Sequence, residues 1–163
     1  MSAVEIPREI REKKLIALRE KHARRRRKNI GLDRERLRAD FKAFCKEAWE
    51  VCEPGRPLKW NWHLDVICDH LQLCAAGKLR RLIITVPPRS MKSYLVNVFY
   101  PVWVWLNEPH HQFNNYSNNA KLAIRDSRRS RILILSQWFQ ERWGDEITLS
   151  RDQAEKANFQ NSA

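Results

Sequence analysis

The sequence predicts an α/β fold in which a parallel β-sheet follows a helical N-terminal lead-in. Residues 82–86 form a short, continuous apolar run with β-branched side chains, which is typical of a strand covered on both faces. A helical pattern follows from Met91, and a weaker strand pattern at residues 111–117 precedes a helical pattern at residues 118–135. This alternation of strand and helix favours parallel pairing through right-handed crossovers.

Helix signals also divide the N-terminal half of the chain. Pro7 predicts the start of a charged helix that ends near Asn29. Gly31, with Asp33 as the next N-cap, predicts a break before a second helix that runs to residue 52. We therefore expect three regions: a basic helical lead-in at 1–32, a helical segment at 33–78 and a core at 79–163.

Capping and breaking residues predict the remaining helix boundaries. Asn61 is a candidate cap for a helix that Gly77 ends. Pro101 predicts a kink in the helix that begins near Met91, and Ser136 predicts the cap of one more short helix. Mixed polar sequence, ANFQNSA, ends the chain.

The positive charge is concentrated near the N-terminus. The formal net charge is +12, and residues 1–30 contain eleven Lys and Arg against four Asp and Glu, which gives that segment +7. Such a concentration favours a polyanionic partner, although a solvated helical face has the same composition. The dense run ARRRRK supplies the candidate phosphate-backbone contacts, namely Arg24, Arg25, Arg26, Arg27 and Lys28.

Other features argue against secretion, membrane insertion and zinc-ribbon chemistry. The first residues, MSAVEIPREIREKK, have no apolar core, so we expect a cytoplasmic protein. The longest apolar run, residues 94–106, falls short of the roughly 20 residues that a membrane span needs. Cysteine pairs with Cys-x-x-Cys spacing are absent, which predicts reduced core thiols, while a metal site with His63 and His70 remains the alternative. The four cysteines are Cys45, Cys52, Cys68 and Cys74.

The stretch RRLIITVPPRSMKSYLV, residues 80–96, has the layout of a phosphate-binding loop. Lys92 can reach terminal phosphates and Ser93 can ligate magnesium at the start of a helix. The strict pattern Gly-x-x-x-x-Gly-Lys-Ser/Thr would place glycine where this chain has Val86 and Met91. Arg89 adds a second cation beside these residues. The alternative is an ordinary capped helix start.

From residue 41 onward the chain resembles the start of the ATPase domain of tailed-phage terminase large subunits, the motors that package viral DNA. The resemblance is carried by WNWHLDVICDHL, RRLIITVPPRSMKSYLVNVFYPVWVW, IRDSRRSRILILSQWFQERWGD and DQAEKANFQN. Phosphate loops of that family take forms similar to Pro-Pro-Arg-x-x-Lys-Ser. The resemblance implies an incomplete parallel sheet of P-loop NTPase type, with ATP and Mg²⁺ as cofactors. Its implied cofactor-binding residues are Arg89, Ser90, Met91, Lys92, Ser93 and His63.

Within that resemblance, Lys92 would contact the β- and γ-phosphates, Ser93 the magnesium ion, and Arg89 the phosphates. Trp60, Trp62 and His63 occupy the place of an adenine-recognition element. For the two tryptophans we favour packing into the core instead, and for His63 both interpretations stay open. On the helix at 118–135, an outward cationic face would touch DNA, a neighbouring subunit or only solvent. That face carries Arg125, Arg128, Arg129 and Arg131, and the face predicted to contact the sheet carries Ala120, Ala123, Ile124, Ser127 and Ile134.

The resemblance also implies parts that this sequence lacks, namely an acidic catalytic strand and a nuclease domain. Asn114 and Asn115 further depart from the apolar strand expected at their position. We therefore expect a truncated, phage- or prophage-encoded chain in the host cytoplasm that is inactive as an ATPase or endonuclease by itself. The resemblance implies double-stranded DNA, a terminase small subunit and a portal protein as partners, and a homo-oligomeric ring for the complete protein. A small basic nucleic-acid-binding or adaptor protein is the alternative, and a helicase fragment is a third one.

Overall fold

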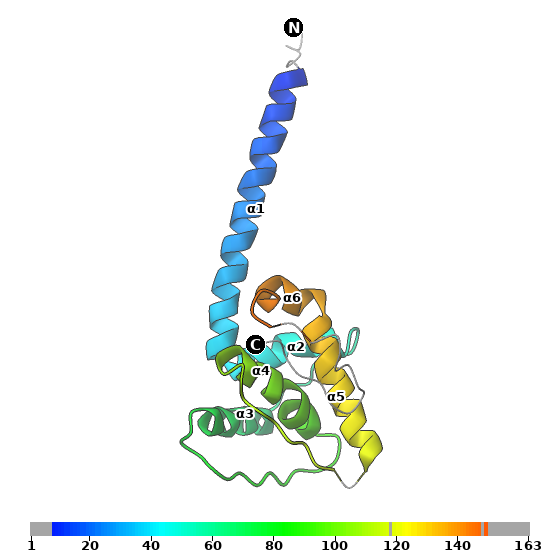
Figure 1. Cartoon of the computed structure of the whole chain (residues 1–163). Helices are drawn as coiled ribbons and strands as arrows, with labels where there is room; N and C mark the ends of the chain where they lie inside the picture. The colour runs from blue at the N-terminus through cyan, green and yellow to red at the C-terminus, as the bar shows by residue number, and fades with distance from the viewer. Residues whose placement is uncertain (1–7, 118, 148, 150–163) are drawn as a thin grey trace.

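The computed structural model describes residues 8–117, 119–147 and 149. Within them the α/β prediction is wrong, because the chain is helical and contains no β-strand or sheet. The helices follow one another as α1 (Arg8–Ala39), α2 (Phe41–Cys52), α3 (Trp62–Ala75), the π-helix η1 (Tyr94–Phe99), α4 (Tyr100–Asn107), α5 (Ala120–Leu135) and α6 (Gln137–Trp143). Helix α1 extends far beyond the others, which cluster around its C-terminal end (Figure 1).

The prediction of a helix break at Gly31 is wrong, because α1 continues through this residue. Asp33 therefore lies inside α1 and does not cap a second helix. An exposed glycine in a helix costs only about 1 kcal/mol relative to alanine, and most of the 32 residues of α1 are good helix formers such as Arg, Lys, Glu, Leu and Ala. The chain breaks instead at Asp40, whose carboxylate accepts hydrogen bonds from the backbone N–H groups of Lys42 at 2.9 Å and Ala43 at 3.1 Å. A capped N-terminus, rather than the glycine, therefore sets the boundary.

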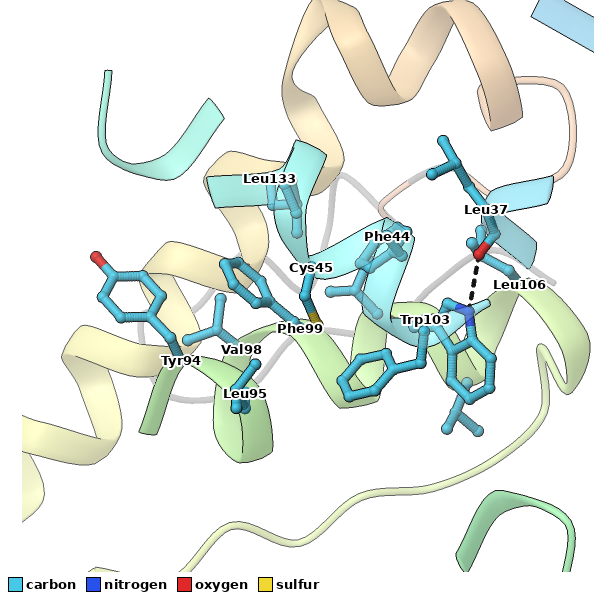
Figure 2. Close-up of a cluster of buried hydrophobic side chains, with 14 of the residues drawn as sticks. Leu37, Phe44, Cys45, Tyr94, Leu95, Val98, Phe99, Trp103, Leu106 and Leu133 are labelled. Carbon is cyan, nitrogen blue, oxygen red and sulfur yellow. Dashed lines mark hydrogen bonds between the residues drawn. The ribbon is translucent and has the colours of Figure 1, made fainter. Parts of the chain in front are cut away.

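The core lies between α2 and the continuous helical stretch formed by η1 and α4, with α3, α5 and α6 packed around them. Residues 94–106 were expected to form a buried helix, and most of their side chains are buried, as predicted. Pro101 lies inside this continuous stretch, two residues after the π-helix η1 ends, so its missing N–H falls where the helix changes from π to α. Figure 2 shows how Phe99 and Trp103 from this stretch meet Phe44 and Cys45 from α2.

Residues 81–87 have no regular secondary structure, so the predicted inner strand is wrong. Burial nevertheless alternates as in a strand: Leu82, Ile84 and Val86 pack against the core, while Ile83 is 92% exposed. A strand needs a neighbour to satisfy its backbone groups, and the described residues supply none. The expectation that both faces of this segment are covered is therefore also wrong, because Ile83 is exposed.

The second predicted strand is also absent from the described structure. Residues 111–117 belong instead to the loop that connects α4 to α5. Phe113 anchors this loop, with its ring centroid 6.0 Å from that of Tyr100 and 6.3 Å from that of Trp105. Asn114 and Asn115 are exposed, so their amides carry no burial cost.

Three other helix predictions are confirmed. Asn61 caps α3 by accepting the N–H of Trp62 at 2.8 Å, and Gly77 follows the helix with φ of 69°. Ser136 caps α6 by accepting the N–H of Phe139 at 3.2 Å. The closing ANFQNSA lies outside the described residues. No described helix combines the length and the apolar character that crossing a membrane would require.

Candidate phosphate-binding site

The loop before η1 has an unusual backbone. Arg89 has φ of 67° and Met91 has φ of 60°, and these are the two non-glycine residues with positive φ in the described part of the chain. Left-handed backbone costs a non-glycine residue about 1–2 kcal/mol. Met91 stands where a strict phosphate loop has glycine, so this position adopts a glycine-like conformation without a glycine.

This backbone leads directly into a helix. Helical backbone begins at Lys92, and η1 follows from Tyr94. The first N–H groups of a helix lack partners within it, and left-handed turn residues beside them can gather N–H groups into an anion-binding concavity. The Ser90 hydroxyl donates to the carbonyl of Pro87 at 2.5 Å, which holds the turn closed. A π-helix is rare and is frequently found at functional sites.

Two cations and one hydroxyl accompany these N–H groups. Arg89 and Lys92 are exposed, so both charges can meet a ligand. Ser93 is half-buried, and its side chain makes no capping hydrogen bond to the helix. Its oxygen is a suitable ligand for a magnesium ion whose other ligands are phosphate oxygens and water. The loop therefore fits a phosphate chain with its magnesium.

The structure brings Arg89, Ser90, Met91, Lys92 and Ser93 into one loop but does not join His63 to them. His63 lies on α3, where its ring centroid is 6.2 Å from that of Trp62. Among the described residues, it makes no hydrogen bond or ring contact to the loop.

The core interpretation of the two tryptophans holds only in part. Trp60 packs partly against the core and donates to a carboxylate oxygen of Asp65 at 3.0 Å. Trp62 is 72% exposed, so the expectation that it packs into the core is wrong. As the first residue of α3 after its cap, it projects from the start of that helix.

A polar pocket of about 80 Å³ adjoins the loop and shares Ser93 with it. Its polar lining comes from the N-cap of η1 and η1 itself, from the loop before α5 and from α5: Ser93, Asn97, Asn115, Tyr116, Ser117, Arg125 and Asp126. Sequence reasoning missed Asn97 and Asp126 as site residues. Each carries a signal in the sequence: Asn97 is an amide inside an apolar run, and Asp126 is the one carboxylate of an otherwise cationic helix.

Asp126 is buried and fully engaged on one oxygen. Its Oδ1 accepts hydrogen bonds from the Nε of Arg125 at 2.8 Å and lies 2.7 Å from the Nη2 of the same residue. Its Oδ2 accepts from the amide of Asn97 at 3.1 Å. The face of α5 that packs inward includes Asp126 and Ser130, whereas Ala120 and Ile124 are exposed, so the predicted inward face is only partly right.

The start of η1 is fixed by a second group of polar contacts. The Tyr94 hydroxyl donates to Glu53, and the Nη2 of Arg129 lies 3.4 Å from the same Glu53 oxygen. Burial and the Glu53 contact hold the pKa of Tyr94 well above its usual value, so this phenol stays a donor. Arg129 is half-buried here. Of the four arginines on the predicted cationic face of α5, Arg125 and Arg128 are exposed, and Arg129 and Arg131 are half-buried.

The basic run on α1 is accessible. Arg24, Arg25, Arg26 and Lys28 are exposed, and the side chain of Arg27 lies outside the described residues. The Nη2 of Arg26 lies 2.8 Å from a carboxylate oxygen of Glu141, which ties α1 to α6. The other exposed members of the run remain on the surface of a helix that projects from the body (Figure 1).

The alternative metal site finds no support, since no group of three potential ligands among His, Cys, Asp and Glu is present in the described chain. Cys45 and Cys68 are buried, and Cys52 and Cys74 are half-buried free thiols. Burial raises the pKa of the Cys45 thiol well above its usual value.

Comparison with family models, with curated proteins and with solved structures finds no match to this chain.

Proposed function

We propose that residues 89–93 bind the phosphates of ATP with Mg²⁺, and that the chain is the ATP-binding part of a DNA-packaging motor similar to terminase large subunits. The observation that carries the proposal is the left-handed backbone of Arg89 and Met91 directly before a helix start. Strained backbone of this kind occurs preferentially at active sites and ligand-binding loops. This backbone lies within Pro-Pro-Arg-Ser-Met-Lys-Ser, the stretch that carries the resemblance.

Each residue of the loop has a separate role in this proposal. The backbone N–H groups around Met91 and Lys92 bind phosphate oxygens, and the ammonium of Lys92 neutralises the terminal phosphates. Arg89 adds a planar donor from the opposite end of the turn. Ser93 contributes a hydroxyl oxygen to the magnesium ion.

Titration of the purified chain with a fluorescent ATP analogue and Mg²⁺ tests the proposal. We expect Lys92→Ala to weaken binding by about tenfold or more, because a charge-assisted hydrogen bond contributes about 1.5–3 kcal/mol. Lys78→Ala is the matched control, since Lys78 is an exposed lysine on the connection after α3. Absence of binding by the unaltered chain, or equal affinity of the Lys92→Ala and Lys78→Ala variants, would refute the proposal.

A second candidate function is non-specific binding of double-stranded DNA through α1. Exposure of Arg24, Arg25 and Lys28 on a projecting helix favours it. It is compatible with the packaging role and also with the alternative of a small basic adaptor protein. Nucleotide binding distinguishes the two, because the adaptor does not require it.

A further inference from the structure

The connection between α3 and η1 contains a stretch that is extended but unpaired. Its side chains alternate between contact with the core and exposure to solvent. The inward ones are Leu82, Ile84 and Val86, and the exposed ones are Arg81, Ile83 and Thr85. Alternation with a period of two residues is typical of extended backbone. Figure 1 shows this connection along the lower margin of the body, away from α1.

The backbone groups of this stretch have no hydrogen-bond partner among the described residues. The N–H groups of Lys78 and Leu79, just before it, both donate to the carbonyl of Leu73, but those of residues 80–86 donate to no described acceptor and their carbonyls accept from no described donor. An extended stretch presents both N–H and C=O groups along each of its edges, and an added strand binds to such an edge. Because the inward side chains already hold the backbone in place, little of its conformational entropy remains to be lost on binding.

Positive charge accompanies the open stretch. Between Asp69 and Glu108 the sequence has no acidic residue. Lys78, Arg80 and Arg81 are exposed, and none of them has an ion pair within the part of the chain that the structure describes. This local excess favours an acidic occupant, and the net charge of +12 disfavours a second copy of the chain.

The free carbonyls favour a peptide over a nucleic acid as the acidic occupant. Phosphate oxygens are acceptors only, so a phosphate backbone can satisfy the N–H groups of the stretch but not its carbonyls. A peptide strand supplies donors and acceptors with the matching spacing. The side chain of Ile83, which is 92% exposed, also gains a contact if an apolar residue lies opposite it.

We propose that residues 80–86 bind an extended acidic segment of another protein by β-strand addition. In an antiparallel arrangement, an apolar residue of the partner lies opposite Ile83, and acidic residues after it lie opposite Arg81 and Arg80. The two prolines that follow the stretch lack N–H groups and end the pairing. The proposal does not depend on phosphate binding by the neighbouring loop.

Fluorescence anisotropy of the labelled peptide Thr-Val-Thr-Ile-Thr-Glu-Glu, titrated with the full chain, tests the proposal. Two N-methylated forms of the peptide, modified at its odd or at its even residues, distinguish backbone pairing from side-chain contacts. Since one edge of a strand carries alternate N–H groups, we expect one form to bind at least about tenfold more weakly and the other to bind within about twofold of the parent peptide. For the same reason, hydrogen exchange should slow at about three or four amides of residues 80–86 in the complex.

Ile83→Ala should weaken peptide binding about three- to fivefold, as expected for the loss of one cross-strand pair. Leu32→Ala is the matched control, because it removes an apolar side chain that is 65% exposed on α1, and it should leave binding unchanged. The parent peptide failing to bind, equal effects of the two N-methylated forms, or equal effects of the two substitutions would each overturn strand addition.

Two further measurements identify a different occupant. Stronger protection of residues 80–86 by a single-stranded oligonucleotide than by the peptide would assign the stretch to nucleic acid and overturn the proposal. Sedimentation equilibrium detects a second copy of the chain. A dimer that Ile83→Ala dissociates and Leu32→Ala does not would likewise replace the acidic partner, whereas a monomer is the expected result.

Discussion

The guanidinium carbon of Arg129 lies 4.3 Å from the centroid of the Tyr94 ring, so a side chain of α5 covers the residue with which η1 begins. The same guanidinium lies 3.4 Å from Glu53 at the end of α2. One arginine therefore joins three helices immediately behind the candidate phosphate loop. Arg129 of α5 and Glu53 at the end of α2 thus fix the position of Tyr94, the first residue of η1. The free backbone N–H groups of this helix start lie next to the candidate phosphate loop.

We expect Arg129→Ala to lower the free energy of unfolding by about 2 kcal/mol. The change removes a partly desolvated cation–π contact and leaves Glu53 and Asp126 with one cationic neighbour fewer. Urea denaturation followed by tryptophan fluorescence measures the loss. Arg128→Ala, at the exposed neighbouring position, should stay within about 0.5 kcal/mol of the unaltered chain. Equal effects of the two substitutions would contradict this role of Arg129.

Trp103 connects α4 to the end of α1 through a buried hydrogen bond. Its indole N–H donates to the carbonyl of Leu37 at 3.0 Å, and Leu37 is fully buried (Figure 2). Trp103→Phe should cost about 2–4 kcal/mol, because it leaves that carbonyl unpaired and opens a cavity. Trp62→Phe, at a position that is 72% exposed, is the control and should change stability little. A loss below about 1 kcal/mol for Trp103→Phe in urea denaturation would count against the contact.

Stability should fall at alkaline pH partly because of Cys52. Burial raises the pKa of its thiol from 9.0 to about 12. Between these values the unfolded chain loses the proton while the folded chain keeps it, so stability is complete below pH 9 and declines as pH rises. We expect Cys52→Ala to make the decline between pH 8 and 10 about 1 kcal/mol shallower, measured by urea denaturation at each pH. An unchanged pH dependence would show that this thiol does not contribute.

DNA binding through α1 should depend steeply on salt and little on sequence. Replacing Arg24, Arg25 and Lys28 by alanine should reduce the slope of log K against log salt by about three, since each phosphate contact contributes about 0.9. Fluorescence anisotropy with two unrelated duplexes measures both properties. Replacing Lys78, Arg80 and Arg81 removes the same charge from another exposed segment. If both triple variants lost the same slope, net charge rather than α1 would explain binding.

Local signals in the sequence predicted local structure well. Asn61 and Ser136 were recognisable as caps because a cap depends on its own side chain and the next three residues. Gly31 misled because its cost within a helix is small, whereas Asp40 offered a capping carboxylate nine residues later. In the candidate phosphate loop, the expectation that Lys92 and Ser93 lie at a helix start is confirmed.

Non-local features could not be predicted in the same way. The apolar run at 82–86 has the alternating burial of a strand, but whether another strand pairs with it depends on segments far away in the sequence. The pocket likewise forms only when η1, the loop before α5 and α5 meet. The sequence marks Asp126 only as the single carboxylate of a cationic helix, and its place in the pocket follows from its burial and from its contacts with Arg125 and Asn97.

The backbone at Met91 gives a test that is independent of any ligand. Met91→Gly and Met91→Ala remove the same atoms beyond Cβ, so the difference between them reports on the backbone. At φ of 60°, glycine is unstrained and alanine is not, and we expect the glycine variant to be more stable by about 1 kcal/mol. In ordinary helical or extended backbone the order would be reversed by about 0.5–1 kcal/mol, because glycine loses more conformational entropy on folding. Lys121→Gly and Lys121→Ala, in the exposed first turn of α5, provide that reversed order as an internal control. Urea denaturation of the four variants decides the matter, and an alanine variant more stable than the glycine variant at position 91 would show that this residue is not left-handed in solution.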